Sequence, residues 1–426
     1  MALGIVRVSH RPGLASRTHS RKVLATQAAL LIAICSFSGA GGATPALAAA
    51  NSTSWAHPAH PASLPAALGL FSISCPGAET CWAVGRSRHG TVALRWNGRA
   101  WATIPIPTPR AQNEYDNGAS VACAAPTSCW AVGGTDNDSV GSAASSDTVA
   151  HWNGERWRLV PVPSPKQNWL GTRYADDALQ SVSCASPSEC WAVGYQGSRR
   201  LALLWNGRRW RRIATPPAYS PIVRSDLMGV TCAGPNACWA VGTAPLCWGS
   251  PRRCSQESVD GVLRWGGARW KEASAGKASK NQLLSAVSCV SSHDCWAIGA
   301  NGGKNQAIHW NGKRWLSVQI PTPGSNWSVA FGLPGLFGIA CASPDLCWAV
   351  GTDLGPGGTG GNEILKWDGH RWSVATVPQP AGDSRGELRS VACNARRSCW
   401  AVGQFLPSGV GEVLRWSGRR WRRAKV

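Results

Sequence analysis

The sequence is poor in charge of one sign and lacks long apolar runs. Its 426 residues include 43 Lys and Arg but only 22 Asp and Glu, and charged residues make up 15% of the chain. The hydrophobic fraction of 44% is enough for a packed core, which excludes intrinsic disorder over most of the chain. No apolar run after residue 50 approaches the ~20 residues of a membrane-spanning helix. The 48 Gly and 28 Pro argue against a long helical bundle.

Residues 1–48 are predicted to be a signal peptide. Five basic residues and no acid precede an apolar stretch that begins at Val23, and an Ala-x-Ala sequence ends at Ala48. We expect cleavage after Ala48 or one or two residues later, with an uncleaved anchor as the alternative. Loss of the five basic residues lowers the formal net charge from +21 to about +16. The product is expected to be secreted, and 34 Arg against 9 Lys is typical of an exported bacterial protein.

Seven copies of one unit follow, over residues 72–426. Each holds a C-x5-C pair whose second Cys is followed by Trp-Ala, by Val or Ile, and by Gly. Each copy then has a turn motif flanked by two Trp five positions apart, as in Trp96 to Trp101. The copies start 48 to 61 residues apart. We expect residues 49–71 to be a linker or to supply an extra strand.

Each unit is interpreted as four short strands, a to d. Seven four-stranded units of about 50 residues predict an all-β seven-bladed β-propeller of antiparallel blades. An open β-solenoid and two separate β domains are the alternatives. Small residues on strand a are expected to lie near the central axis: Ser72, Ser120, Ser181, Gly229, Ala286, Gly338 and Ser390.

The turn between strands c and d is predicted to be a two-residue hairpin turn. Asn97-Gly98 and its equivalents carry the residues that favour positive φ at both turn positions. This geometry sets Trp96 opposite Arg99 and Leu94 opposite Trp101, with Leu94, Trp96 and Trp101 on one side of the sheet.

The repeat resembles secreted bacterial propellers built from SVSC…CWAVG…WNGxxW units and, more distantly, kelch and galactose-oxidase propellers. It departs from kelch in having a single Gly after strand b in most units and turn Trp residues only five positions apart. The resemblance covers residues 72–426 and implies a fold without a specific activity.

The cysteines are predicted to form a disulfide framework. Paired Cys at constant spacing in an exported chain favour an a–b disulfide in each blade, with one extra pair in the fourth unit. Cys35 is lost with the signal peptide. A metal site is the alternative, but the spacing lacks clustered ligands, so no metal and no cofactor is expected. The expected pairs are Cys75/Cys81, Cys123/Cys129, Cys184/Cys190, Cys232/Cys238, Cys247/Cys254, Cys289/Cys295, Cys341/Cys347 and Cys393/Cys399.

One face of the ring is predicted to bind a ligand. The a–b and c–d turns keep a constant length, whereas the b–c connections do not: from the strand-b Trp to the first turn Trp the steps are 14, 22, 14, 26, 14, 19 and 16. Aromatic and acidic residues in or beside the variable connections suit an extracellular glycan or protein. The candidate binding residues are Tyr115, Asp116, Trp169, Tyr174, Asp176, Asp177, Tyr195, Tyr219, Trp248 and Trp327.

The opposite face is predicted to be basic. Lys or Arg fills 10 of the 14 positions that follow the turn Gly residues. These cations fit an anionic wall polymer or phospholipid headgroups, while a solvated rim with Arg stacked on Trp is the alternative. Nucleic acid is not an expected partner of an exported protein.

No catalytic constellation is found in the sequence. There is no Ser/His/Asp spacing and no motif of sialidases, copper oxidases or quinoprotein dehydrogenases. A non-catalytic binding propeller is therefore the first hypothesis. The alternatives are a carbohydrate-active hydrolase or lyase that uses loop carboxylates, and a structural protein associated with the cell wall.

Overall fold

Twenty-eight strands form seven antiparallel sheets of four strands each in the described part of the chain. This computed structural model describes residues 67–87, 90–107, 114–137, 146–163, 177–197, 199–217, 225–247, 254–276, 281–323, 335–354, 360–381 and 385–426. The predicted signal peptide and most of the linker lie outside these residues. Among the described residues there is no helix long and apolar enough to cross a membrane.

Each sheet is one blade, made of four consecutive strands in chain order. The first three blades comprise β1 (Ala67–Gly77), β2 (Thr80–Ser87), β3 (Gly90–Trp96), β4 (Trp101–Ile104); β5 (Glu114–Ala125), β6 (Ser128–Asn137), β7 (Ser146–Trp152), β8 (Trp157–Leu159); β9 (Asp177–Ser186), β10 (Glu189–Gln196), β11 (Arg199–Trp205) and β12 (Trp210–Arg212). The next two comprise β13 (Leu227–Cys232), β14 (Cys238–Cys247), β15 (Cys254–Trp265), β16 (Trp270–Glu272); β17 (Gln282–Ser291), β18 (Asp294–Asn301), β19 (Lys304–Trp310) and β20 (Trp315–Val318). The last two comprise β21 (Leu336–Ser343), β22 (Leu346–Leu354), β23 (Gly360–Trp367), β24 (Trp372–Val374); β25 (Arg385–Ala395), β26 (Ser398–Leu406), β27 (Val410–Trp416) and β28 (Trp421–Arg423).

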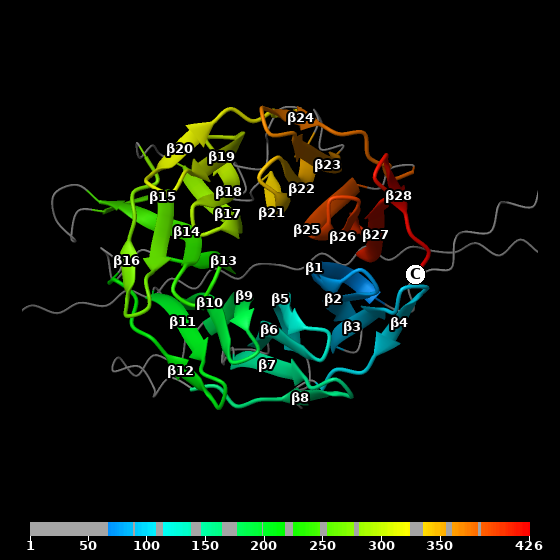
Figure 1. Cartoon of the computed structure of the whole chain (residues 1–426), viewed down its shortest axis with the longest axis horizontal. Coiled ribbons are helices and arrows are strands. Elements are labelled where there is room, and N and C mark those ends of the chain that lie inside the picture. Colours follow the sequence, from blue (N-terminus) through cyan, green and yellow to red (C-terminus); the bar gives the residue numbers. More distant parts are fainter. Residues whose placement is uncertain are drawn as a thin grey trace, which may run out of the picture. The chain divides into compact units, whose positions relative to one another are not determined.

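The seven blades form a closed ring, so the predicted seven-bladed propeller is confirmed and the open solenoid and two-domain alternatives are wrong. Figure 1 shows strand a of each blade near the centre and strand d at the perimeter. The first blade meets the last because β1 packs against β25, β26 and β27. Strand β1 begins at Ala67, five residues before the expected start of the propeller.

Neighbouring blades are joined near the axis by serine side chains on strand a. The hydroxyl of Ser72 accepts a hydrogen bond from the Val121 N–H at 3.0 Å, and the same contact recurs from Ser120 and Ser181 to the next blade. Ser390 closes the ring by accepting from the Ile73 N–H at 3.3 Å. The small residues predicted near the axis therefore lie there, and the hydroxyls of the four serines among them satisfy backbone donors between blades.

The Gly of the repeat lies inside strand b and meets a bulge in strand a. In the first blade the register shifts between Leu70 and Ser72, which brings the carbonyl of Gly69 over Gly85. A Cβ at Gly85 would collide with that oxygen, and Gly194, Gly242, Gly299, Gly351 and Gly403 meet the same obstacle in their blades. The Gly of the repeat is thus required by close backbone approach.

A Trp triad fills the outer part of each interface between blades. The strand-b Trp is at most 2% exposed and packs between the two turn Trp residues of the following blade. Centroid distances to the first of these are 4.6–4.9 Å, and the second ring lies edge-on at 4.9–5.3 Å. Trp400 of the last blade packs on Trp96 and Trp101 of the first, so the seventh triad closes the ring.

Seven disulfides link strands a and b, one in each blade, as predicted. The paired Cα atoms lie 3.9–4.1 Å apart, and in the last six blades the two Cys residues occupy facing positions of the strand register. Disulfides in this number are typical of oxidising compartments. The bonded pairs are Cys75–Cys81, Cys123–Cys129, Cys184–Cys190, Cys232–Cys238, Cys289–Cys295, Cys341–Cys347 and Cys393–Cys399.

The two cysteines of each pair differ in burial, which the repeat pattern does not indicate. The first, on strand a, is partly buried and packs against the edge of a blade core. The second, at the start of strand b, has no exposed surface and belongs to the core itself, because the strand-b Trp of the preceding blade and the turn Trp residues of its own blade cover it. The fully buried cysteines are Cys81, Cys129, Cys190, Cys238, Cys295, Cys347 and Cys399. Their role is structural, as the disulfide prediction implies.

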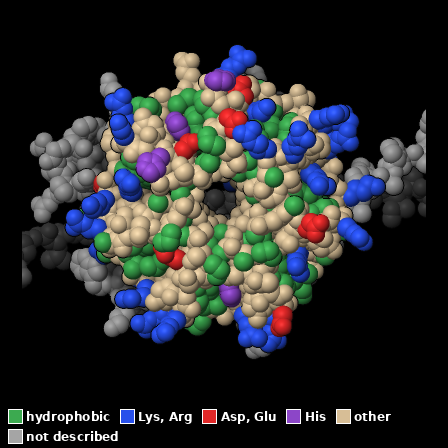
Figure 2. Space-filling view, viewed as in Figure 1, with side chains coloured by type: hydrophobic (Ala, Val, Ile, Leu, Met, Phe, Trp, Pro, Cys, Tyr) green, Lys and Arg blue, Asp and Glu red, His purple; other side chains and the backbone are tan. Residues whose placement is uncertain are grey.

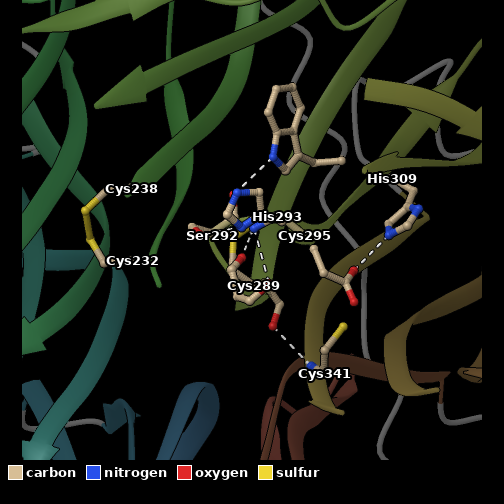
Figure 3. The surroundings of a disulfide bond; sticks show 12 residues. Cys232, Cys238, Cys289, Ser292, His293, Cys295, His309 and Cys341 are labelled. Carbon is tan, nitrogen blue, oxygen red and sulfur yellow. Dashed lines mark hydrogen bonds and ion pairs between the residues drawn. A yellow bond between two sulfur atoms is a disulfide. The ribbon is translucent and has the colours of Figure 1, made fainter. Parts of the chain in front are cut away.

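Figure 3 shows two neighbouring disulfides, Cys232–Cys238 and Cys289–Cys295. It also shows the N–H of Cys341 donating to Ser288 of the adjacent blade at 3.1 Å, so the strand-a cysteine takes part in the contact between blades. The predicted extra pair in the fourth unit, Cys247 and Cys254, occupies facing positions of β14 and β15, but the side chains of these two residues are outside the described part.

The predicted two-residue c–d turn is wrong. Trp96 pairs with Trp101 and Leu94 with Thr103, so the loop has four residues. Asn97 keeps a negative φ and its side-chain oxygen accepts from the N–H groups of Arg99 and Ala100 at 3.0 and 2.9 Å, while only Gly98 has a positive φ, of 91°. The register differs by two residues, so Leu94, Trp96 and Trp101 still share one side of the sheet.

Candidate functional site

The two ends of the blades form two different faces. The a–b and c–d turns make one face, called here the turn face, and the b–c and d–a connections make the other, called the loop face. The b–c connection is as short as two residues in the fifth blade, between Asn301 and Lys304, and spans eight residues in the second, between Asn137 and Ser146. The variation in length is therefore confined to the loop face, where a ligand would meet a different outline at each blade.

Most of the predicted ligand-binding residues lie outside the described part of the chain. The side chains of Tyr115, Asp116 and Asp177 are not described either, although their backbones are: the first two lie in β5, where Tyr115 pairs with Asp136, and the third opens β9. Tyr195 is part of β10 and only 7% exposed, which leaves little of its ring for a ligand. The remaining candidates, outside the described residues, are Trp169, Tyr174, Asp176, Tyr219, Trp248 and Trp327.

A cavity of about 220 Å³ lies on the axis of the ring, lined by strand a of all seven blades. Strand a runs from the loop face towards the turn face, so its early residues surround the loop-face end of this cavity. The position between the buried Leu and the small axial residue varies around the ring. Its occupants are Phe71, Ala119, Gln180, Met228, Ser285, Phe337 and Arg389. All of them except Ala119 line the cavity as described.

The sequence analysis missed this axial position. The alignment of the seven units contains the information, because the flanking Leu, small residue and Val or Ile recur while this position does not. The recurring Leu is fully buried in six blades and fixes the depth of strand a in the ring: Leu70, Leu179, Leu227, Leu284, Leu336 and Leu388. The second blade has Gly118 at this place.

Polar bridges join several blades near the loop face. The amide of Asn305 donates to Glu363 of the next blade at 2.7 Å, and the amide of Asn362 donates to Glu412 of the blade after that, also at 2.7 Å. Glu412 accepts a further bond from Arg423 at 2.9 Å. Burial leaves these two carboxylates 4% and 3% exposed, so the bridges stabilise the interface and do not present acids to a ligand.

Burial raises the pKa of several of these acids. Desolvation raises the pKa of Glu363 to about 8 against the hydrogen bond from Asn305, and the nearby charge of Asp353 adds to the rise. Asp260, which accepts a bond from Gln306 at 2.5 Å, has its pKa raised to about 6 by desolvation. Glu363 is held neutral near pH 7, which suits a buried position between two blades.

The acids do not assemble a metal or catalytic centre among the described residues. No group of three His, Cys, Asp or Glu side chains is placed to hold a metal ion there. Asp353 and Glu363 influence one another, but they lie on adjacent strands of a single blade and Glu363 is buried. The convergence of acids from different connections, which a glycosidase or lyase needs, is not seen in this part of the chain.

The turn face carries the basic residues as predicted. All ten Lys and Arg residues that follow the turn Gly are exposed, and Figure 2 shows Lys and Arg side chains around the perimeter of the face in view. Stacking on Trp is the role of a different set of cations, on strand c. Arg95, Arg264 and Arg415 lie 5.1–5.8 Å from the centroids of triad Trp rings, and the turn cations make no such contact among the described residues.

No family model and no curated protein matches the sequence. Solved structures of similar fold include the polysaccharide lyase PL25 ulvan lyase bound to -[GlcA(1-4)Rha3S]-, with a TM-score of 0.52 at 10% identity over 82% of this chain and 92% of that one. A second structure of a PL25 ulvan lyase matches with a TM-score of 0.52 at 9% identity, over 82% of this chain and 92% of that one. YCF48 from Cyanidioschyzon merolae has a TM-score of 0.45 at 18% identity, over 76% of this chain and 88% of that one. At identities of 9–10% the two lyase structures show the fold alone.

Proposed function

We propose that this protein is a secreted, non-catalytic propeller that binds an extracellular glycan through its loop face, with an extracellular protein as the alternative ligand. The observation that carries the proposal is the contrast between the faces: seven Trp triads and seven disulfides hold a uniform ring, while all variation in connection length falls on the loop face. A rigid scaffold that presents unequal loops is the usual arrangement of a binding protein.

An enzyme is the alternative, since a propeller of similar fold is a polysaccharide lyase. The described acids favour binding over hydrolysis or elimination. Glu363 and Glu412 are buried in polar bridges between blades, and a buried, hydrogen-bonded acid cannot reach a polysaccharide. The proposal therefore expects no turnover of a bound glycan.

The test is binding of the mature protein, from residue 49 onward, to wall polysaccharides and a glycan panel at low and high salt. We expect retention that survives high salt and falls at least ~10-fold in Trp169→Ala, Tyr174→Ala or Trp327→Ala. Val374→Ala is the control, because this exposed apolar residue lies on β24 and away from the loop face. Release of shortened saccharide by the wild-type protein would instead establish the enzyme.

A second candidate role is attachment to an anionic wall polymer or to phospholipid headgroups through the turn face. The exposure of all ten turn cations favours it. Such binding is weakened by salt because screening acts on exposed charges. Replacement of Arg208, Arg209, Arg419 and Arg420 by Gln is expected to abolish salt-sensitive retention and to leave glycan binding at the loop face intact; unchanged retention would remove this role.

A further inference from the structure

The loop-face end of the axial cavity has different chemical groups on its two sides. The sixth, seventh and first blades are neighbours in the closed ring, and they place Phe337, Arg389 and Phe71 at equivalent positions of strand a. The opposite side of the cavity offers Gln180 and Met228. Arg389 is the one charged residue among the described residues that line the cavity, so a single cation stands between two aromatic rings.

Arg389 is held in place by two contacts. Its guanidinium carbon lies 4.3 Å from the centroid of Phe337, and its Nε donates to Glu387 at 2.5 Å. Glu387 is itself fixed by a bond of 2.9 Å from the amide of Gln404. The Phe337 ring therefore covers one face of the guanidinium, and Glu387 bonds to its Nε–H. The Arg389 side chain is 30% exposed, and within the described residues neither Nη group has a hydrogen-bond partner.

The serine side chains of the cavity wall already bond to the backbone of the neighbouring blades. The hydroxyls of Ser72, Ser120, Ser181 and Ser390 accept backbone N–H groups of the next blade. Ser285 donates to the carbonyl of Leu336 at 2.6 Å. The cavity therefore has one preoriented cationic fork, two flanking aromatic rings and a wall whose serine hydroxyls each already make a hydrogen bond to the next blade. This combination fits a group that is anionic at one end and apolar on a flat face.

We propose that the axial cavity binds the carboxylate of an acidic sugar residue, with the Nη groups of Arg389 on the carboxylate and the sugar ring against Phe71 or Phe337. The proposal rests on the glycan-binding function above and specifies its ligand class as a uronate-containing glycan. A cavity of about 220 Å³ takes one such residue at a chain end and not a polymer threaded through it. Arg matches the planar, two-oxygen geometry of a carboxylate better than a point charge does.

The probes are a galacturonate tetrasaccharide and a neutral glucose tetrasaccharide, measured by titration calorimetry with the mature protein. We expect the acidic probe to bind, and Arg389→Gln to weaken it ~10-fold or more, as loss of a charge-assisted pair does. Arg389→Lys keeps the charge and removes the fork, and is expected to fall between the two. Phe337→Leu is expected to weaken binding several-fold.

Arg199→Gln is the matched control, because it removes the same charge from an exposed arginine that opens β11 at the loop face, away from the axis. Unchanged melting of each variant shows that the ring is intact. If Arg389→Gln does not fold, Arg389→Lys and Phe337→Leu carry the test. The proposal fails if the acidic probe does not bind, or if the Arg389 and Arg199 variants weaken it equally.

Two further outcomes separate this proposal from the broader one. One outcome is that neutral glycans are retained, that retention depends on Trp169, Tyr174 or Trp327, and that Arg389→Gln does not change it. This outcome would overturn the axial site but would support the glycan-binding function. Displacement of the acidic probe by millimolar inorganic phosphate, at an affinity matching the probe's own, would show a general anion site and would also overturn the sugar assignment.

Discussion

The outer interfaces between blades and the inner rim of the axial cavity are built on opposite plans. Each outer interface holds the same Trp triad, with the strand-b Trp at most 2% exposed in all seven blades. The inner rim holds seven positions occupied by six different residue types, among them Phe, Arg, Gln and Met. The contacts that stabilise the ring recur in every blade, whereas binding of a ligand that is not itself symmetric requires residues that differ between blades. A ligand-binding site is therefore expected at positions where the seven units carry different residues.

The largest expected effect on stability comes from a substitution in one of the Trp triads. Trp400→Ala removes the ring that packs on Trp96 and Trp101 and so opens the seventh interface, where the described residues include no chain segment running from the last blade to the first. We expect a loss of about 5 kcal/mol in the free energy of unfolding, the upper end for a buried Trp. Urea unfolding measures it.

Trp191→Ala is the control for this substitution, since its triad joins two blades that are also linked along the chain. It is expected to cost about 3–5 kcal/mol without separating the ends of the ring. A loss for Trp400→Ala no larger than about 1 kcal/mol, the size of an ordinary surface or partial-burial change, would mean that the serine contacts near the axis close the ring by themselves.

The polar bridges near the loop face are expected to respond to pH, while the Trp triads do not. Glu363 has a pKa of about 8 in the folded chain against 4.5 for an ordinary Glu, so the folded state holds its proton more tightly. The stability that this group contributes is therefore fully present below pH 4.5 and is lost as pH rises towards 8. At ~1.4 kcal/mol per pKa unit the loss reaches about 4–5 kcal/mol at most.

Glu363→Gln tests this, because Gln keeps an oxygen for the amide of Asn305 and cannot ionise. The melting temperature between about pH 5 and pH 9 is expected to fall less steeply in this variant than in the wild type. Glu155→Gln, an exposed acid in a c–d turn, should leave the slope unchanged. Parallel slopes for Glu363→Gln and the wild type would contradict the raised pKa.

What the sequence could predict depends on whether a feature lies within one unit. The blade count, strand order and seven disulfides follow from local spacing, and the axial strand-a serines follow from their size. The Trp triads cross between units, and the repeat does not say whether Trp82 meets its own turn Trp pair or the next one. The structure shows the next: Trp82 packs on Trp152 and Trp157. The equivalent triad of Trp400 with Trp96 and Trp101 lies in the core cluster that buries Cys81 completely, which the spacing of Cys81 from Cys75 does not reveal.

Two features of the structure, the length of the c–d turn and the axial Arg389, differ from the sequence prediction or are absent from it for physical reasons. The Asn-Gly pair favours a tight hairpin, but the side chain of Asn97 bonds two backbone N–H groups and supports a four-residue loop instead. The axial Arg389 is not among the predicted site residues because it lies on strand a, whereas the aromatic and acidic residues that indicate a site lie in or beside the connections. Its setting depends on Phe337 of the preceding blade, which is far from it in sequence, and on Phe71 of the first blade, which comes near it only once the ring closes.

An intermediate effect is expected from the disulfides. Cys289→Ala with Cys295→Ala opens one a–b link with a sequence separation of 6. By the chain-entropy argument this costs about 2 kcal/mol, since a short loop constrains the unfolded chain only modestly. Melting of this variant, compared with the fully reduced protein, checks it. A reduced protein that melts like the oxidised one would show that the Trp triads alone hold the blades.

The smallest expected effect concerns the cations that cover the triads. Arg264 lies 5.5 Å from the centroid of Trp239 and 5.4 Å from that of Trp310, and Leu204 occupies the equivalent strand-c position one blade earlier. Arg264→Gln is expected to cost about 0.5–1 kcal/mol, and Leu204→Arg to gain a similar amount by placing a cation over Trp191 and Trp265. The pair is measured by urea unfolding at low salt. If both substitutions destabilise, the position serves only to cover apolar surface; opposite signs would show that a cation adds to a triad that is otherwise the same in every blade.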